Sequence, residues 1–293
     1  MIPASSGGNG PDRFVIIIGA MKSGTTSLFE ILSQHPQVCG CKEKEPNYFT
    51  EGVYNAKNAD WYKGLWNWRD KEHRVALEAS TAYTKFPAYS GVPARIAEFQ
   101  DASFKFIYIM RNPVQQIASH LQHAQYVGWE KRWDGRVPQY MIDIVSYATQ
   151  LDKYMECFDR NSMFLVTLDE FEENPAFILK DIMMFLGISG GVTLSGLDRK
   201  LNTGELYSLS GPLRGFLESK TAERVKSWMP AHIKHYMRRG LGSFLRNVNG
   251  PSVASDLLGP AEKRRILVNI EDEINRLERD YDIRVPRAWL DGR

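Results

Sequence analysis

Residues 19–26 constrain the fold of this chain more than any other stretch, because they join an apolar strand to a helix through a glycine-bearing turn. The preceding run, residues 14–18, is continuously apolar and predicts a buried β-strand. The following run, residues 27–32, has apolar residues at helical spacing, and the two threonines before it are suitable helix caps. Loop N–H groups and the helix dipole favour an anion at such a turn, and Lys22 adds a positive charge. The segment therefore predicts a binding site for a phosphate-bearing ligand.

The position of the lysine distinguishes this loop from that of a nucleotide triphosphatase. A Walker A loop has the pattern G-x-x-x-x-G-K-[ST], with the lysine directly after the second glycine. Here Lys22 precedes Gly24, and Thr25 follows that glycine. A nucleotide kinase or NTPase of the P-loop class therefore fits poorly, although it stays an alternative, as does a tight turn without a ligand.

The composition is that of an ordinary soluble globular protein, with 43% hydrophobic and 25% charged residues among 293. A net charge of +2 gives no global basic field, so we expect no nucleic-acid partner. No apolar stretch approaches the roughly 20 residues of a membrane span, and no signal peptide is recognisable at the start. The three cysteines, Cys39, Cys41 and Cys157, lack metal-ligand spacing. We therefore expect a cytoplasmic protein that binds no metal.

Strand and helix patterns alternate after the first loop. Further apolar runs predict strands over residues 75–79, 104–110 and 163–167. Helical patterns occupy residues 93–99, 114–126, 140–158, 175–186 and 262–281. This alternation predicts an α/β fold with a P-loop-like central parallel sheet and helices on both faces. We expect a flexible lead-in over residues 1–12 and a single domain over residues 13–293, which is also compatible with a piece of a longer protein.

A second anion-binding element is predicted where another strand meets a helix. Ligands of parallel sheets bind at the carboxyl ends of the strands, and both Lys22 and Arg111 directly follow such ends. Arg111 can bind a phosphate through two hydrogen bonds, and Ser119 lies about two helical turns further on. Alone, the pair is better explained as a helix-capping arginine and a surface serine. Beside the first loop, it predicts part of the same site.

The charged segment of residues 42–49 contains a candidate general base. Charge runs are usually solvated loops, but Pro46 and two aromatic residues follow this one. Glu45, next to Pro46, is therefore the better candidate than Glu43. A carboxylate with a fixed position near a lysine-lined anion site suits a general base. His123 shares a helix face with His120 and is the second candidate.

Two further segments are candidates for ligand contacts. Residues 198–204 form a basic stretch that either closes over a nucleotide as a lid or is an exposed turn. Residues 60–68 are rich in aromatic rings, which either belong to the core or stack on sugar rings.

The ordered set GAMKSGTTSL, KEKEPNYF and RNPVQQIASH, with a later NTG loop, resembles the sulfotransferases that use 3′-phosphoadenosine 5′-phosphosulfate. The most similar group is that of the carbohydrate sulfotransferases, which includes the heparan sulfate enzymes and their bacterial relatives. The resemblance extends over residues 14–204 and, more faintly, to residues 277–281 and Trp289. Two positions depart from the family pattern, because Ser80 and Thr203 stand where a lysine is common.

This resemblance implies a donor site and a catalytic carboxylate. The residues that it assigns to the donor are Lys22, Ser23, Gly24, Thr25, Thr26, Arg111, Ser119, Arg199, Lys200 and Gly204. The first loop would hold the 5′-phosphosulfate, and Arg111 with Ser119 would hold the 3′-phosphate. Arg199 or Lys200 would compensate for the missing lysine of the late loop. Glu45 matches the catalytic carboxylate of the family.

The residues suit in-line sulfuryl transfer, in which charge develops on the leaving oxygen. Lys22 would stabilise that charge, and Glu45 would take the proton of the attacking hydroxyl or amine. A sulfonate carries less charge than a phosphoryl group, so the reaction demands no metal. The expected partners are the small-molecule donor and an acceptor. A glycan is the first choice of acceptor, and a lipid, a polyketide intermediate or a small alcohol is the alternative.

Overall fold

The computed structural model has a five-stranded parallel β-sheet at the centre of residues 10–127, 135–189 and 257–290, which are the residues that the structure describes. The strands are β1 (Arg13–Gly19), β2 (Val38–Gly40), β3 (Val75–Ala79), β4 (Ser103–Met110) and β5 (Met163–Thr167). Their order is β2-β3-β1-β4-β5, and all neighbouring pairs are parallel. The chain therefore proceeds to one side of β1 first and to the other side later. The loop after β1 lies at this topological switch point, where parallel sheets bind ligands.

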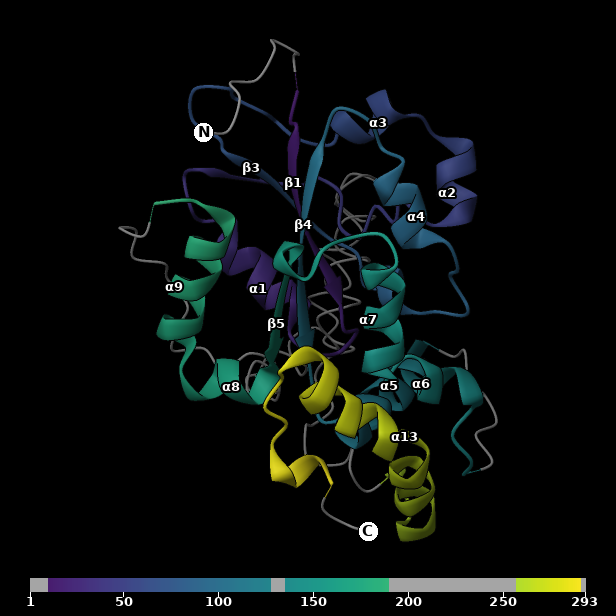
Figure 1. The fold of residues 1–293 in the computed structure, drawn as a ribbon. Coiled ribbons are helices and arrows are strands. Elements are labelled where there is room, and N and C mark those ends of the chain that lie inside the picture. Colours follow the sequence, from purple (N-terminus) through teal and green to yellow (C-terminus); the bar gives the residue numbers. More distant parts are fainter. Residues whose placement is uncertain (1–9, 128–134, 190–256, 291–293) are drawn as a thin grey trace, which may run out of the picture.

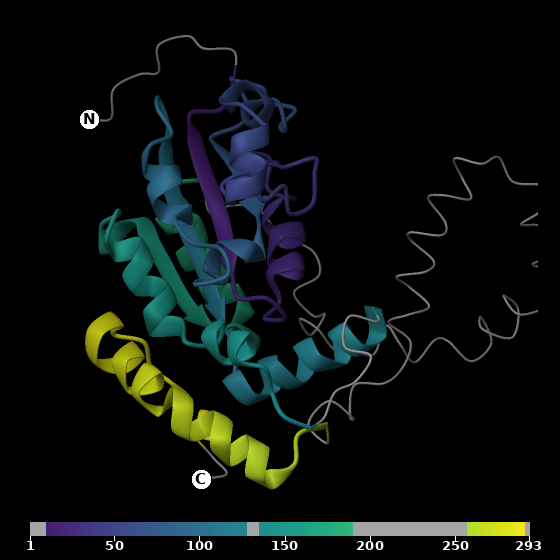
Figure 2. The same ribbon diagram turned by 90° about the vertical axis from the view of Figure 1, so that its right-hand side faces the viewer.

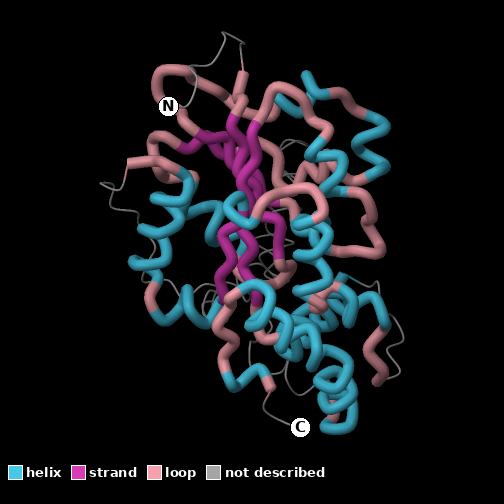
Figure 3. Tube along the Cα trace, in the orientation of Figure 1, coloured by secondary structure: helices cyan, strands magenta, loops and turns pink. Residues whose placement is uncertain are grey.

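Helices cover both faces of the sheet, as the alternating pattern predicts (Figures 1 and 3). One face is covered by α1 (Thr25–Leu32), α8 (Leu168–Glu173) and α9 (Pro175–Leu186). The other is covered by α4 (Val92–Ala97), α5 (Pro113–Val127), α6 (Gln139–Asp143), α7 (Tyr147–Met155) and α13 (Pro260–Tyr281). Two short helices, α2 (Glu51–Ala56) and α3 (Ala59–Lys63), precede β3. Strand β1 is buried on both faces, since Val15 and Ile17 pack under α1 while Phe14, Ile16 and Ile18 pack into the opposite core.

Element boundaries follow local sequence signals closely in the second half of the sheet. The predicted strand over residues 163–167 is β5, and the predicted helix over residues 175–186 is α9. Gly187 ends α9 in the left-handed conformation, with φ 70°, as glycine commonly does. The prediction of one helix over residues 140–158 is wrong, because the chain leaves the helical conformation at Ser146 (φ −77°, ψ 69°) and forms α6 and α7. The side chain of Gln150 bonds the carbonyl of Asp143 at 2.9 Å and stabilises this break.

Two local features of the helix starts differ from the sequence-based expectation. The N-cap of α1 is Gly24, with φ 88°, and no side chain caps this helix, so the two threonines are its first residues and not its caps. Helix α8 was not predicted, although its start has a recognisable signal. Thr167 and Glu170 form a reciprocal capping box, in which the Thr167 hydroxyl accepts the N–H of Glu170 at 3.1 Å.

The aromatic segment of residues 60–68 contributes to the core. Tyr62 is 0% and Trp66 is 4% exposed. Both rings pack against Phe14 of β1, each with ring centroids 5.2 Å apart. The core interpretation is therefore confirmed for these two residues, and neither ring is available to stack on a sugar.

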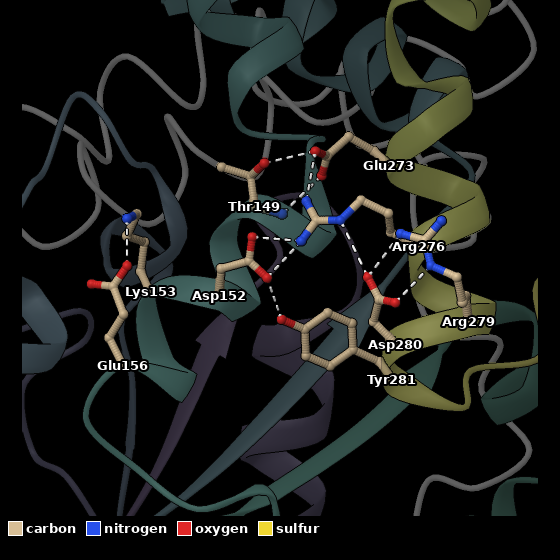
Figure 4. Close-up of polar contacts among 9 residues, drawn as sticks. All are labelled: Thr149, Asp152, Lys153, Glu156, Glu273, Arg276, Arg279, Asp280 and Tyr281. Carbon is tan, nitrogen blue, oxygen red and sulfur yellow. Dashed lines mark hydrogen bonds and ion pairs between the residues drawn. The ribbon is translucent and has the colours of Figure 1, made fainter.

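Helix α13 packs against α5, α6 and α7 and crosses the molecule beside the end of the sheet (Figures 1 and 2). Figure 4 shows Arg276 pointing from α13 toward α7, where it donates to both carboxylate oxygens of Asp152 at 2.7 and 2.6 Å. Tyr281 donates to the same carboxylate at 2.6 Å. From the same helix, Glu273 accepts hydrogen bonds from the backbone and hydroxyl of Thr149 at 2.8 and 2.6 Å. These contacts fix α13 to α7.

Replacing Arg276 with glutamine is expected to lower the free energy of unfolding by about 1–3 kcal/mol, because the bidentate, charge-assisted pair with Asp152 is lost. Only 20% of the Arg276 side chain is exposed, so water cannot fully replace the lost contacts. Arg279 is the matched control, since its side chain is 63% exposed and contacts Asp280 at the surface. Urea unfolding is expected to show a lower midpoint for Arg276→Gln and an unchanged one for Arg279→Gln. Equal shifts in the two variants would contradict this account of how α13 is held.

Candidate functional site

The loop between β1 and α1 is held tightly against neighbouring elements. Ala20 donates its N–H to Ile109 of β4 at 2.7 Å, and Ser23 donates its N–H back to Ala20 at 3.2 Å. A Cβ at Gly19 would lie 2.2 Å from the hydroxyl oxygen of Thr84, so only glycine fits there. The loop is therefore a rigid turn whose amides lie at the N-terminus of α1.

Lys22 is a half-buried cation within this turn. Its backbone is left-handed, with φ 67°, and no carboxylate of the described chain forms an ion pair with it. Burial lowers the pKa of Lys22 most, and the positive charges of Arg111 and Lys44 lower it further. A cation so placed gains from a bound anion, because the anion supplies the missing counter-charge.

Arg111 joins the end of β4 to this loop. Its Nη1 donates to the backbone carbonyl of Lys22 at 3.0 Å, and its Nη2 donates to Gln115 at 3.4 Å. Its Nε is buried and has no partner in the described part of the chain. The predicted meeting of Lys22 and Arg111 is thus present in the structure, and Arg111 retains an unused donor.

The backbone of Arg111 is supported by residues that the sequence analysis did not identify. The Tyr147 hydroxyl donates to the carbonyl of Arg111 at 2.6 Å, and it also contacts Gln116. The ring of Trp289 lies 5.9 Å from that of Tyr147, and its Nε1 donates to Asp169 at 3.0 Å. The resemblance had indicated Trp289, whereas a buried tyrosine or glutamine on a helix has no local signal.

The hydroxyl residues predicted for the donor site differ in orientation. Ser23 is 0% exposed, and its hydroxyl lies 3.4 Å from Gln116 inside the protein. Thr25 is also buried, whereas Thr26 is exposed at the start of α1. Ser119 is half-buried on α5, two turns after Arg111. The remaining predicted donor residues, Arg199, Lys200 and Gly204, lie outside the described residues.

Glu45 lies in a constrained turn. Its backbone is left-handed, with φ 50°, and Asn47 has φ 52°. Pro46 is buried between them, and Thr81 lies with its hydroxyl 3.5 Å from Glu45 Oε2. Glu45 is half-buried while Glu43 is exposed, so the two carboxylates differ as the sequence suggested.

Several basic groups surround Glu45 and Lys22. The pKa of Lys85 is lowered by burial and raised by the nearby Glu45 carboxylate. Burial lowers the pKa of His123, and the charges of Lys22, Lys44 and Lys85 lower it further. His123 therefore faces the same region as Lys22, and protonation of its ring is disfavoured there.

His120 is expected to make the stability of the protein pH-dependent. Burial lowers its pKa from 6.5 to about 4, with further contributions from Lys85, His123 and Lys22. The unfolded chain binds a proton at this histidine more readily, so the free energy of unfolding should fall as the pH decreases from 6.5 toward 4. The expected loss is about 2–3 kcal/mol, since one pKa unit corresponds to about 1.4 kcal/mol. Urea unfolding of His120→Gln should show a correspondingly shallower pH dependence. An unchanged slope would contradict the assignment.

The described residues contain neither a metal-ligand cluster nor a helix that could span a membrane. They contain no group of three or more His, Cys, Asp or Glu residues arranged to hold a metal ion. Among the described helices, none combines the length and the apolar character needed to cross a lipid bilayer.

A sequence model of the sulfotransferase domain matches residues 12–242. The heparan sulfate glucosamine 3-O-sulfotransferase 3A1 of Mus musculus is 28% identical over 190 residues, which cover 61% of this chain and 46% of that protein. The membrane-associated sulfotransferase kil1 of Dictyostelium discoideum is 34% identical over 119 residues, covering 40% of this chain and 24% of that protein. The chain thus spans about half the length, or less, of these curated relatives.

A similar fold is found in the crystal structure of a sulfotransferase from Alicyclobacillus acidocaldarius. The TM-score is 0.62 at 21% identity, and the alignment covers 95% of this chain and 98% of that one. The strand order and the placement of helices described above are therefore a known arrangement.

Proposed function

The chain belongs to the sulfotransferase domain family, and we propose that it transfers the sulfuryl group of 3′-phosphoadenosine 5′-phosphosulfate to a hydroxyl or amine of a glycan. The observation that carries this proposal is the junction of Lys22 and Arg111 at the carboxyl ends of β1 and β4. The donor has anionic groups at both its 5′ and 3′ positions, and the junction offers two cations from adjacent strands. Among the described residues, Nε of Arg111 has no hydrogen-bond partner and Lys22 has no ion pair, and both groups fit such a ligand.

The proposed donor contacts follow from this placement. The turn of residues 22–26 binds the 5′-phosphosulfate with its amides and Lys22, since a helix N-terminus favours an anion. Arg111 and Ser119 bind the 3′-phosphate, and Arg199, Lys200 and Gly204 of the late loop complete the donor site. The buried hydroxyl of Ser23 shapes the turn, so its contribution to the ligand comes through the backbone.

The proposed chemistry assigns one task to Lys22 and one to Glu45. The donor supplies an activated sulfuryl group whose sulfur is attacked by the acceptor as the bond to the 5′-phosphate oxygen breaks. Lys22 stabilises the negative charge that develops on that oxygen. Glu45 takes the proton that the acceptor hydroxyl or amine loses.

Glu45 suits the base better than His123 for an electrostatic reason. Lys22, Lys44 and Lys85 all lower the pKa of His123, so they oppose the formation of an imidazolium ion. Glu45 is instead a carboxylate that is held in place by its left-handed turn and by the contact with Thr81. His123 therefore stays the second candidate.

The proposed acceptor is an anionic glycan. Two relatives from Mus musculus are heparan sulfate glucosamine 3-O-sulfotransferases, 3A1 and 3B1. In this chain Lys44 is exposed and Lys85 is half-buried, and both contribute positive charge to the region of His123. Such charge suits carboxylate or sulfate groups on a sugar chain. An acceptor screen that compares sulfated oligosaccharides, neutral oligosaccharides, lipid alcohols and polyketide alcohols tests this choice, and transfer only to a lipid or polyketide would refute it.

Calorimetry with adenosine 3′,5′-bisphosphate tests the donor assignment. We expect a Kd of roughly micromolar order for the unmodified protein, and a weakening of about 30-fold or more in Arg111→Ala, because a bidentate charge-assisted contact is lost. The exposed Arg74 supplies a control, and Arg74→Ala should bind as the unmodified protein does. Binding of ATP with magnesium, and none of the bisphosphate, would instead indicate the nucleotide kinase or NTPase alternative.

A further inference from the structure

The carboxylate of Glu78 is buried in the protein, and its hydrogen bonds with the described residues come from hydroxyl groups. It lies on β3 with 0% exposure, and no Lys or Arg of the described residues forms an ion pair with it. Tyr62 donates to its Oε2 at 2.5 Å, and Ser80 donates to its Oε1 at 2.6 Å. Burial raises the pKa of Glu78, and hydrogen bonds from Ser80, Tyr62 and Tyr83 oppose this shift. A buried carboxylate without a counter-ion is costly, so its presence calls for an explanation.

Two of these hydroxyls also bind the backbone that follows Glu45. Ser80 Oγ accepts the N–H of Asn47 at 3.2 Å. Tyr83 Oη accepts the N–H of Phe49, also at 3.2 Å. A hydroxyl has a single proton, so a hydroxyl that donates to Glu78 presents only lone pairs to these amides. The Ser80 proton is used in the bond to Glu78, and the lone pairs of Ser80 Oγ are thereby turned toward the N–H of Asn47.

The backbone that these hydroxyls hold is the part of the site that needs support. Glu45 and Asn47 are both left-handed residues other than glycine, a conformation that persists only where surrounding contacts maintain it. The N–H groups of Asn47 and Phe49 donate to the buried hydroxyls of Ser80 and Tyr83 and not to solvent. Without these acceptors, the turn would lose the contacts that keep it in this conformation.

We propose that Glu78 is a positioning residue, which acts through Ser80 and Tyr83 to hold residues 45–49 in the conformation that presents Glu45 to the anion site. The inference rests on the proposed function of Glu45 as the general base.

Ser80→Ala and Tyr62→Phe form a matched pair that tests the proposal. Each removes one hydroxyl donor to Glu78, but only Ser80 also accepts an N–H from residues 45–49. We expect kcat of Ser80→Ala to fall roughly 10- to 100-fold, as small displacements of catalytic groups do, while the Kd for adenosine 3′,5′-bisphosphate stays unchanged. The kcat of Tyr62→Phe should fall less than about threefold, even if the thermal midpoint of this variant falls as far as that of Ser80→Ala. Equal kcat values in the two variants would overturn the proposal, and Tyr83→Phe provides the same test if Ser80→Ala does not fold.

A double-mutant cycle separates positioning of Glu45 from a general loss of structure. In a Glu45→Gln background, Ser80→Ala should lower kcat no further, because the group that it positions is already absent. A fall of equal size in both backgrounds would overturn the proposal. Full activity of Glu45→Gln would overturn the assignment of the base and this inference with it. Full activity of Ser80→Ala beside an impaired Glu45→Gln would overturn this inference alone.

Discussion

Replacing Lys22 with alanine is expected to reduce kcat for sulfuryl transfer by about 10²–10³-fold, the usual effect of removing one group that stabilises transition-state charge. Lys22 is held in a left-handed turn beside the N-terminus of α1, and Arg111 fixes its carbonyl. Charge on the leaving oxygen grows during the reaction, so the loss should exceed the change in ground-state binding. We therefore expect the Kd for adenosine 3′,5′-bisphosphate to rise by less than about tenfold in the same variant.

An exposed lysine at the other end of the sheet provides the control for this variant. Lys71 precedes β3, whereas Lys22 follows β1, and the two strands are parallel neighbours. Lys71→Ala should retain the kcat of the unmodified protein. Full activity of Lys22→Ala in the same assay would show that the donor site is misplaced.

Replacing Glu45 with glutamine is expected to reduce kcat by about 10²–10⁴-fold, because general base catalysis typically contributes this much. The substitution keeps the size of the side chain and its contact with Thr81 but removes the proton acceptor. The Kd for the bisphosphate should not change, because within the described part of the chain Glu45 forms no hydrogen bond with Lys22 or Arg111.

Glu43 provides a matched carboxylate in the same segment. It is exposed and precedes Glu45 by two residues, so Glu43→Gln should leave kcat unchanged. If Glu45→Gln remained fully active while His123→Asn lost activity, the role of base would belong to His123. Equal losses in the Glu43 and Glu45 variants would indicate a general effect of charge and not a specific base.

The positions of Lys22 and Arg111 could be predicted because each follows directly from a local pattern. An uninterrupted apolar run indicates a strand, a glycine-bearing turn after it indicates the carboxyl end, and parallel strands bring such ends together. The greater burial of Glu45 compared with Glu43 could also be anticipated, since Pro46 and two aromatic residues follow Glu45. The error over residues 140–158 arose where local signals are weak, because the break at Ser146 depends on a side chain one turn further along.

The amino-acid sequence by itself determined the parallel α/β fold, the glycine-bearing turn between β1 and α1, and the family, since these depend on apolar periodicity and on short motifs. Only the tertiary structure decided which groups support them. Tyr147 packs against Trp289 and donates a hydrogen bond to the carbonyl of Arg111. Glu78 orients the hydroxyls that hold the backbone after Glu45. The contacts of Tyr147 with Arg111, and of Ser80 and Tyr83 with the backbone after Glu45, join residues 33 or more positions apart. Such partners are brought together only when the strands lie side by side. The physical reason is that hydrogen-bond direction depends on distance and geometry in three dimensions, which no spacing along the chain specifies.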